Sequence, residues 1–218
     1  MLGLPTQNLQ DIKTDLNRII ELKPEHISVY SLILEEGTLL QQKIEKGELY
    51  TPSEIIERKM YWTVKNTLEE AGYKHYEISN YAKPGFESKH NMDCWNQKEY
   101  IGFGLAAHSY INNTRYSNTE EFELYFSGIA LGDPKTKIIH ETQTKEDQMK
   151  EFMLLGLRKI DGVKISDFKN KFVDNPIYIY RKELEKLDKD ELIEIDINNI
   201  RLTNKGIDLA NLVWAEFV

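Results

Sequence analysis

The chain has 218 residues, of which 40% are hydrophobic and 29% charged, a composition typical of globular domains rather than disordered segments. Its 28 lysine and arginine residues against 36 aspartate and glutamate residues give a formal net charge of −8. This acidic balance disfavours general nucleic-acid binding, which depends on positive charge. No apolar run comes close to the length of a membrane span, about 20 residues, and the N-terminus lacks the pattern of a signal peptide. We therefore expect a cytoplasmic protein that does not bind DNA.

The single cysteine, Cys94, limits the chemistry that this chain can perform by itself. It excludes an internal disulfide. It also excludes a four-cysteine zinc site and a three-cysteine iron–sulfur site built from this sequence alone. Any cluster chemistry would need ligands from outside this sequence.

The first part of the chain predicts alternating helices and strands. Apolar residues at 3.6-residue spacing predict a helix that Asn8 caps and that ends near Leu22, before Pro24. A loop, this helix and the following strand make up the last part of a β–α–β unit, so the sequence reads as one that starts within a fold. The further elements expected here are a strand over 26–33 and a short helix over 39–45.

A second α/β unit is expected next. Thr51 is the predicted N-cap of a helix, with Pro52 at its first position and Glu54 completing a capping box. The helix should end at Gly72, with its inward face formed by Ile55, Tyr61 or Trp62, Val64 and Leu68. The segments Tyr73–Ser79 and Ile101–Ile111 predict strands.

The composition changes near Thr144, and we expect a domain border between residues 133 and 146. Helices are predicted over 148–159, 165–172 and 177–187, and a hairpin turns at Asn198–Asn199 between strands 192–196 and 200–202. Thr203 is expected to cap a terminal helix that reaches Phe217. This order is that of a winged helix. Because residues 181–196 carry more acidic than basic side chains, a packing or docking role is favoured over DNA binding.

His90 and Cys94 are the first candidates for chemistry. Residues four apart share a face of a helix, and both side chains bind soft or borderline metals such as heme iron, copper(I) or zinc. The alternative is a polar surface residue beside a buried small one.

The segment Gly102–Tyr110 is the second candidate. Its glycines and alanines allow close approach either of a ligand or of another backbone segment, and His108 within it could be a core histidine. His26 and His75 are expected in strands and His140 in a loop, none with distinguishing neighbours. No catalytic carboxylate pair or nucleophile–base motif is present. The residues by themselves indicate a ligand-binding α/β domain followed by a winged helix.

Several ordered segments resemble the C-terminal half of the HemW family. These proteins are heme chaperones of the radical S-adenosylmethionine (SAM) superfamily, also described as oxygen-independent coproporphyrinogen III oxidase-like. The resemblance covers essentially the whole chain, in Gly3–Gln7, His26–Leu32 with Glu36–Thr38, Tyr76–Gly85, Gly102–Ser109 and Met153–Arg158.

The family's heme-associated motif, His-Asn-x-x-Tyr-Trp, corresponds here to residues 90–95, with Cys94 in place of the tyrosine. The resemblance makes His90 the candidate ligand of heme iron. The heme-binding candidates are His90, Asn91, Cys94 and Trp95. Cys94 is either an additional thiolate or a filler of the tyrosine's space. No catalytic residue is assigned.

The resemblance also implies the fold. Residues 1–135 would be the C-terminal half of a partial (β/α)₆ radical-SAM barrel that includes the heme motif, and residues 145–218 a small winged-helix-like domain. The family's Cys-x₃-Cys-x₂-Cys loop, which holds a [4Fe–4S] cluster, is absent from this sequence. SAM and the cluster would therefore belong to the full-length parent. The expected SAM-side residues are Gly3, Pro5, Gln7, Ser31 and Ile33, at strand ends that face the site in such barrels.

The expected function is that of the C-terminal part of a heme chaperone, which binds and transfers heme and is not catalytically competent alone. One alternative is that the full-length parent decarboxylates coproporphyrinogen III oxidatively. A second is a module that docks a heme-acceptor protein. Half a barrel exposes strand edges and apolar faces, so we also expect self-association through residues 1–35.

Overall fold

The computed structural model describes residues 1–132 and 136–218, which form two compact units, Met1–Ser88 and Lys89–Val218. Each unit is described by itself below. The two domains expected over 1–135 and 145–218 are inferred from composition and from the family resemblance. They stay a prediction.

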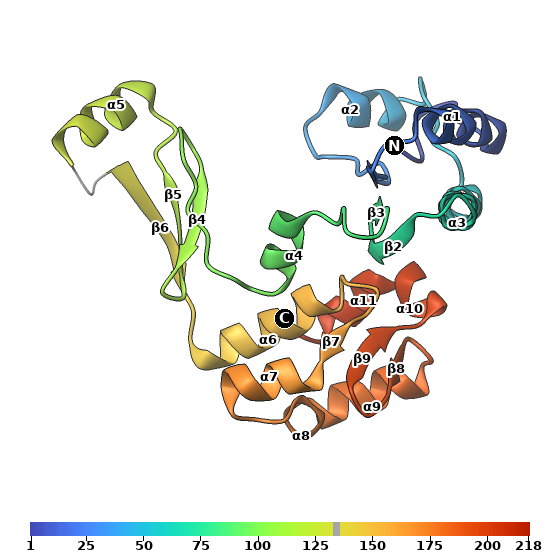
Figure 1. Cartoon of the computed structure of the whole chain (residues 1–218). Helices are drawn as coiled ribbons and strands as arrows, with labels where there is room; N and C mark the ends of the chain where they lie inside the picture. The colour runs from blue at the N-terminus through green and yellow to red at the C-terminus, as the bar shows by residue number, and fades with distance from the viewer. Residues whose placement is uncertain (133–135) are drawn as a thin grey trace. The chain divides into compact units, whose positions relative to one another are not determined.

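The first unit is a three-stranded antiparallel sheet with two long helices that contact each other (Figure 1). The sheet has the order β1–β3–β2, and its core includes the buried side chains of Met60, Leu68 and Tyr81. The elements are α1 (Leu9–Leu22), β1 (His26–Ser28), α2 (Leu39–Glu45), α3 (Glu54–Glu70), β2 (Lys74–Glu77) and β3 (Asn80–Ala82).

Helices α1 and α2 have the predicted bounds. The Asn8 side chain accepts hydrogen bonds from the backbone N–H groups of Gln10 and Asp11, and the Asp11 carboxylate accepts one from the Asn8 N–H. These bonds satisfy N–H groups that have no partner within the helix. The strong local start signal explains why the sequence placed α1 correctly.

The predicted start of α3 is wrong. The N-cap is Ser53 and its side chain makes no capping bond, so Thr51 and Glu54 form no capping box. Because the backbone of Ser53 is extended, with ψ 155°, the helix begins at Glu54 and not at Pro52. Ile55, expected to face inward, is 69% exposed, whereas Val64 and Leu68 are buried as predicted. Gly72 ends the helix with φ +87°, a conformation that favours glycine.

The predicted strands are shorter in the structure. The strand expected over 26–33 ends at Ser28, and a hairpin, β2–β3, replaces the single strand expected at 73–79. Leu2 forms a parallel bridge with Ser31: its N–H donates to the Tyr30 carbonyl at 2.8 Å and its carbonyl accepts from the Leu32 N–H at 2.8 Å. With α1 as the crossover, this is the expected end of a β–α–β unit.

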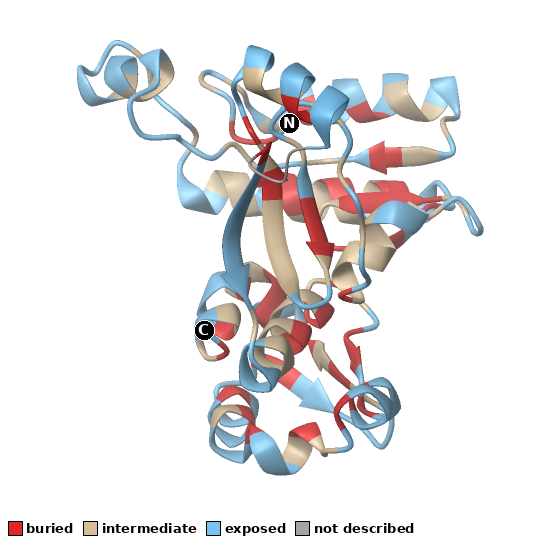
Figure 2. Cartoon of the chain, turned by 90° about the vertical axis from the view of Figure 1, so that its left-hand side faces the viewer, coloured by how far each residue is buried: buried red, intermediate tan, exposed pale blue. Residues whose placement is uncertain are grey.

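The second unit begins with α4 (Lys89–Trp95) and an antiparallel sheet of order β4–β5–β6. Helix α5 lies at one end of this sheet (Figure 1). β6 is exposed at all six positions, which Figure 2 draws in pale blue. The sequence missed α5 and β6, and it placed His140 in a loop although the residue lies in β6. The elements are β4 (His108–Ile111), β5 (Thr114–Asn118), α5 (Phe122–Leu131) and β6 (Lys137–Thr142).

The rest of the second unit is helical with a small sheet of order β7–β9–β8. Helix α7 and the hairpin β8–β9 lie where they were expected. The helix predicted over 177–187 breaks at Tyr180, and the terminal helix breaks at Leu209. The elements are α6 (Lys145–Gly156), β7 (Val163–Lys164), α7 (Ile165–Phe172), α8 (Pro176–Ile179), α9 (Arg181–Lys189), β8 (Ile193–Ile195), β9 (Asn199–Leu202), α10 (Asn204–Asp208) and α11 (Ala210–Ala215).

An aromatic cluster forms the core of this part. The rings of Phe152, Phe168 and Phe172 meet one another at centroid distances of 4.8 to 5.7 Å, and Tyr180 links them to Phe217. Such contacts bury large apolar areas. None of the helices in the described ranges is long and apolar enough to cross a membrane, and the expected cytoplasmic location stays a prediction.

Candidate functional site

Helix α4 places His90 and Cys94 on the same side, as their spacing predicts. The distance between His90 Nε2 and Cys94 Sγ is 3.9 Å. The imidazole is exposed and meets the Tyr100 ring edge-on at a centroid distance of 6.5 Å, while Cys94 and the neighbouring Asn91 are half-buried. The structure therefore brings two soft metal-binding atoms together at an accessible position.

The two side chains differ in how ready they are to bind a metal. Burial raises the pKa of the Cys94 thiol, the Asp93 carboxylate raises it further, and the Arg115 guanidinium opposes both effects. At neutral pH the sulfur is therefore a thiol rather than the thiolate that ligates metals. The exposed His90 imidazole is the more accessible ligand.

The geometry limits how these atoms can bind heme. The two axial ligands of a heme iron lie on opposite faces of the porphyrin. His90 and Cys94 project from one side of one helix, 3.9 Å apart, so no porphyrin ring fits between them. With this arrangement either His90 or Cys94, but not both, would be placed to hold one heme iron.

Trp95, the last residue of α4, contacts the guanidinium group of Arg158. The Arg158 guanidinium carbon is 4.6 Å from the centroid of the Trp95 ring and 4.6 Å from that of the Trp214 ring. Guanidinium groups stack favourably on aromatic faces. Helix α4, the turn after α6 and helix α11 therefore meet at this point.

The two residues after α4 are fixed by lysines. Lys159 Nζ donates to Asn96 Oδ1 at 2.7 Å, and Lys171 Nζ donates to Gln97 Oε1 at 2.7 Å. Gln97 Nε2 in turn donates to Glu151 Oε2 at 2.7 Å. The C-terminal end of α4 is thus tied to α6 and α7, while its His90 end is exposed.

A cavity of about 190 Å³ lies beside Cys94. On its wall, Arg115 Nε is 3.0 Å from Glu141 Oε1, and the same guanidinium pairs with Glu151 and lies over the Tyr110 ring. The cationic charge at the wall is therefore balanced by two carboxylates. The lining residues are Cys94, Trp95, Gln97, Lys98, Tyr100, Tyr110, Arg115 and Leu155.

The glycine–alanine segment is a site of close backbone approach. A Cβ atom on Gly102 would lie 2.2 Å from the His108 carbonyl oxygen. This distance favours tight backbone packing over ligand contact as the reason for this glycine. His108 is exposed rather than a core histidine, and its ring stacks on that of His140 at 5.1 Å, whose Nε2 lies 2.9 Å from Ser117 Oγ.

The expected SAM-side residues gather around the Leu2–Ser31 bridge. Gly3 has φ +77°, which favours glycine. The Gln7 side chain binds its own loop, accepting from the Leu4 N–H at 3.2 Å and donating to the Met1 carbonyl at 3.1 Å. Pro5 and Ser31 are half-buried, and Ile33 is 75% exposed. Gln7 thus stabilises the loop, and its side chain is occupied in doing so.

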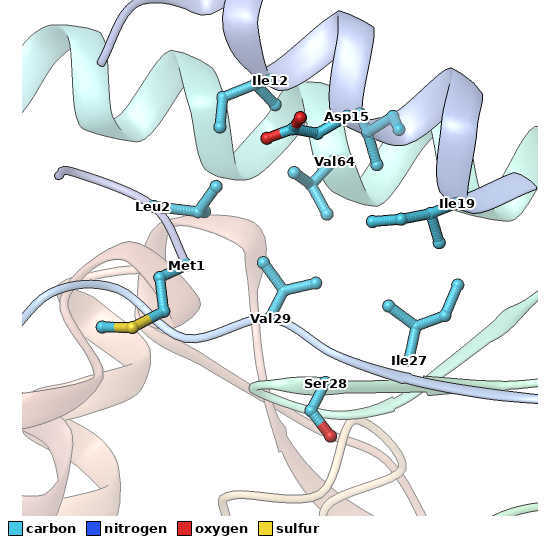
Figure 3. A pocket seen from close by; sticks show the side chains of 10 residues that line it. Met1, Leu2, Ile12, Asp15, Ile19, Ile27, Ser28, Val29 and Val64 are labelled. Atoms are coloured by element: carbon cyan, nitrogen blue, oxygen red, sulfur yellow. The ribbon is translucent and has the colours of Figure 1, made fainter. Parts of the chain in front are cut away.

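A small apolar pocket of about 80 Å³ lies next to this bridge. Figure 3 shows Ile12 and Ile19 of α1 facing Val29 and Ile27, with Asp15 at the helix side. Apart from Asp15 and Ser28, the residues that line it are apolar.

The comparisons with known proteins decide the family. The family model described as the HemN C-terminal domain matches residues 143–209. Heme chaperone HemW of Lactococcus lactis is 37% identical over 99% of this chain and 56% of its own length. The Bacillus subtilis protein of the same name is 38% identical over 100% of this chain and 57% of its own length. The chain belongs to the HemW family.

The HemW-family chain spans about half the length of the curated relatives it matches, and it corresponds to their C-terminal portion. Among solved structures, coproporphyrinogen III oxidase (HemN) from Escherichia coli, a radical SAM enzyme, matches with a TM-score of 0.77. That match has 21% identity and covers 99% of this chain and 53% of the other. It confirms the mixed α/β fold.

Proposed function

We propose that this chain is the heme-binding C-terminal part of a SAM-dependent heme chaperone. The proposal is supported by the two relatives named heme chaperones, each aligned over nearly the whole chain. Residues 1–135 would be the far wall of a partial (β/α)₆ barrel. Residues 145–218, three helical segments followed by a hairpin and a closing helix, would be a winged-helix-like domain.

The observation that carries the proposal is the accessible imidazole of His90 on α4, next to a half-buried thiol and a cavity. Neutral imidazole is a common axial ligand of heme iron. In this proposal His90 ligates the iron of the transported heme, and Cys94, Asn91 and Trp95 shape the surroundings of the ligand. Cys94 occupies the position of the motif tyrosine and leaves the adjoining cavity open.

The iron–sulfur cluster of the superfamily does not fit the residues of this chain. The sequence has one cysteine, and no group of three or more His, Cys, Asp or Glu side chains in residues 1–132 and 136–218 could hold a metal ion. In our proposal the cluster and SAM are bound by the full-length parent, with the edge around Gly3, Pro5, Gln7, Ser31 and Ile33 on the SAM side.

A heme titration tests the proposal. Ferric heme added to the 218-residue chain should give a Soret band, and His90→Ala should weaken the apparent affinity at least tenfold because the axial ligand is lost. His108→Ala, which removes another exposed histidine of the same unit, is the matched control and should bind as the wild type does. Wild-type heme affinity in a folded His90→Ala variant would remove His90 from the ligand role.

A heme acceptor is the proposed partner, and a groove supports its docking on the second unit. The groove, of about 210 Å³, lies between the α8–α9 segment and β8. Its wall combines apolar side chains with Asp188 and with Glu185, which pairs with Arg181 at 2.7 Å. This mostly apolar wall with a small acidic excess suits a protein surface better than DNA. The lining residues are Ile177, Tyr178, Arg181, Leu184, Glu185, Asp188 and Ile195.

A further inference from the structure

The stack of Trp95, Arg158 and Trp214 is built at one end of the heme-motif helix. Arg158 follows α6 at a point where the backbone is fixed: Leu157 and Met153 are fully buried, and the Arg158 N–H donates to the Leu155 carbonyl at 3.2 Å. Its guanidinium carbon lies over the ring of Trp95 in α4 and over the ring of Trp214 in α11, 4.6 Å from each centroid.

The two tryptophans contact Arg158 through their ring faces and not through their indole N–H groups. The Nε1 atoms of Trp95 and Trp214 are buried and find no hydrogen-bond partner in the described part of the chain. Because those N–H groups make no hydrogen bond, the contact with the guanidinium is a directional interaction that both rings share. A planar group can lie flat against two rings at once, whereas an ammonium group cannot.

The same turn also holds the residue after Trp95. Lys159, adjacent to Arg158, is 9% exposed and donates to Asn96 Oδ1 at 2.7 Å. Arg158 therefore contacts Trp95, and Lys159 binds Asn96, so two neighbouring residues hold the end of α4. Helix α4 has only seven residues, so fixing one end of it fixes the direction in which His90, five residues away, projects.

We propose that Arg158 is a positioning residue for heme binding, which orients α4, and with it His90, through simultaneous stacking on Trp95 and Trp214. The inference rests on the proposed function of His90, but the stack is a property of the heme-free chain. Helix α11 thereby contributes to the proposed heme site through Arg158.

The first test is heme binding by Arg158→Lys, which keeps the charge and loses the flat stacking surface. We expect the dissociation constant for ferric heme to rise at least tenfold, with the Soret maximum moving toward that of His90→Ala because the imidazole no longer points at the iron. Arg201→Lys is the control: it changes a half-buried arginine of the same unit that pairs with Glu194, and it should match the wild type.

The second test uses no heme. The N–H groups of Asn96, Gln97 and Lys98 donate to the carbonyls of residues 92 to 94 at 2.9 Å, so their hydrogen exchange reports the order of this helix end. We expect at least tenfold faster exchange there in Arg158→Lys, with α9 unchanged. A wild-type chain lacking a His90-dependent Soret band would refute the proposed function, and the exchange experiment alone would then decide the role of Arg158.

A folded Arg158→Lys variant with wild-type heme affinity and wild-type exchange at residues 96–98 would overturn the inference. Should that variant fail to fold, Trp214→Phe replaces it. It leaves Arg158 and Trp95 in place and reduces only the α11 side of the stack. It should give the same changes at smaller size, and their absence in that folded variant would equally overturn the inference.

Discussion

His75 lies in the interior of the first unit, 3% exposed and stacked on Tyr81 at a centroid distance of 4.5 Å. Burial lowers the pKa of this imidazole to about 4, and the hydrogen bond between its Nε2 and the Ile78 carbonyl opposes the effect only in part. The ring therefore stays neutral in the folded chain at pH values where it would be charged in the unfolded chain.

We predict that His75 makes the first unit sensitive to acid. The unfolded chain takes up a proton as the pH falls through about 6.5, whereas the folded chain does so only near pH 4, so acidification between these values favours unfolding. The free energy of unfolding should fall by about 2 to 3 kcal/mol from this residue between pH 7.5 and 4.5. Urea unfolding at both pH values should show a smaller fall in His75→Phe, and an equal fall in both proteins would contradict the prediction.

At the scale of elements, the start of a helix shows how much a local signal contributes. The Asn8 side chain makes two capping bonds at α1, while Ser53 occupies the same position at α3 and makes none. We predict that Asn8→Ala lowers the free energy of unfolding by about 1 kcal/mol, because two backbone N–H groups lose their partner. Ser53→Ala is the control and should change it by less than about 0.5 kcal/mol. Equal losses in thermal or urea unfolding would show that the capping bonds contribute nothing.

The elements also show what the sequence could predict. Helices α1, α2 and α7 have the bounds that spacing and flanking residues predicted, because these signals lie within a few residues of each element. Strand ends depend on the pairing partner, and this is why the strand expected over 26–33 has only three residues, His26–Ser28, that pair with β3. Helix α5 was missed although apolar residues dominate it, since many of them are exposed and no amphipathic pattern results.

In the candidate site, too, local spacing predicted some features and only the fold shows the others. Spacing alone placed His90 and Cys94 on one face of a helix, and the structure confirms that placement. The contact of Arg158 with Trp95 and Trp214 joins residues from two helices and a turn that are far apart in the sequence. No local pattern encodes such a contact. The resemblance singled out Met153–Arg158 as a segment, but only the fold shows which side chains Arg158 meets.

At the scale of the molecule, residues 1–35 expose several apolar side chains, most of them within three residues of the Leu2–Ser31 bridge. Monomeric proteins seldom leave clustered apolar side chains in water. Those within residues 1–35 that are at least 36% exposed are Met1, Leu4, Leu22, Tyr30, Ile33 and Leu34.

We predict that the chain self-associates through this side. The mass measured by light scattering should rise with protein concentration, and Ile33→Glu should reduce the rise because a charge would have to be buried in the contact. Ile197→Glu changes an isoleucine that is 91% exposed in the β8–β9 turn, and it should associate as the wild type does. A wild-type chain that stays monomeric at high concentration would refute the prediction.

The position of Trp95 on α4 has an optical consequence. Trp95 lies five residues from His90 on the same short helix, about 7.5 Å along its axis. A porphyrin held by His90 would absorb at the wavelengths at which this indole emits, and at such a separation it would quench that emission. If His90 holds heme as proposed, this emission would report heme binding and release, so that transfer to an acceptor could be timed without attaching a dye.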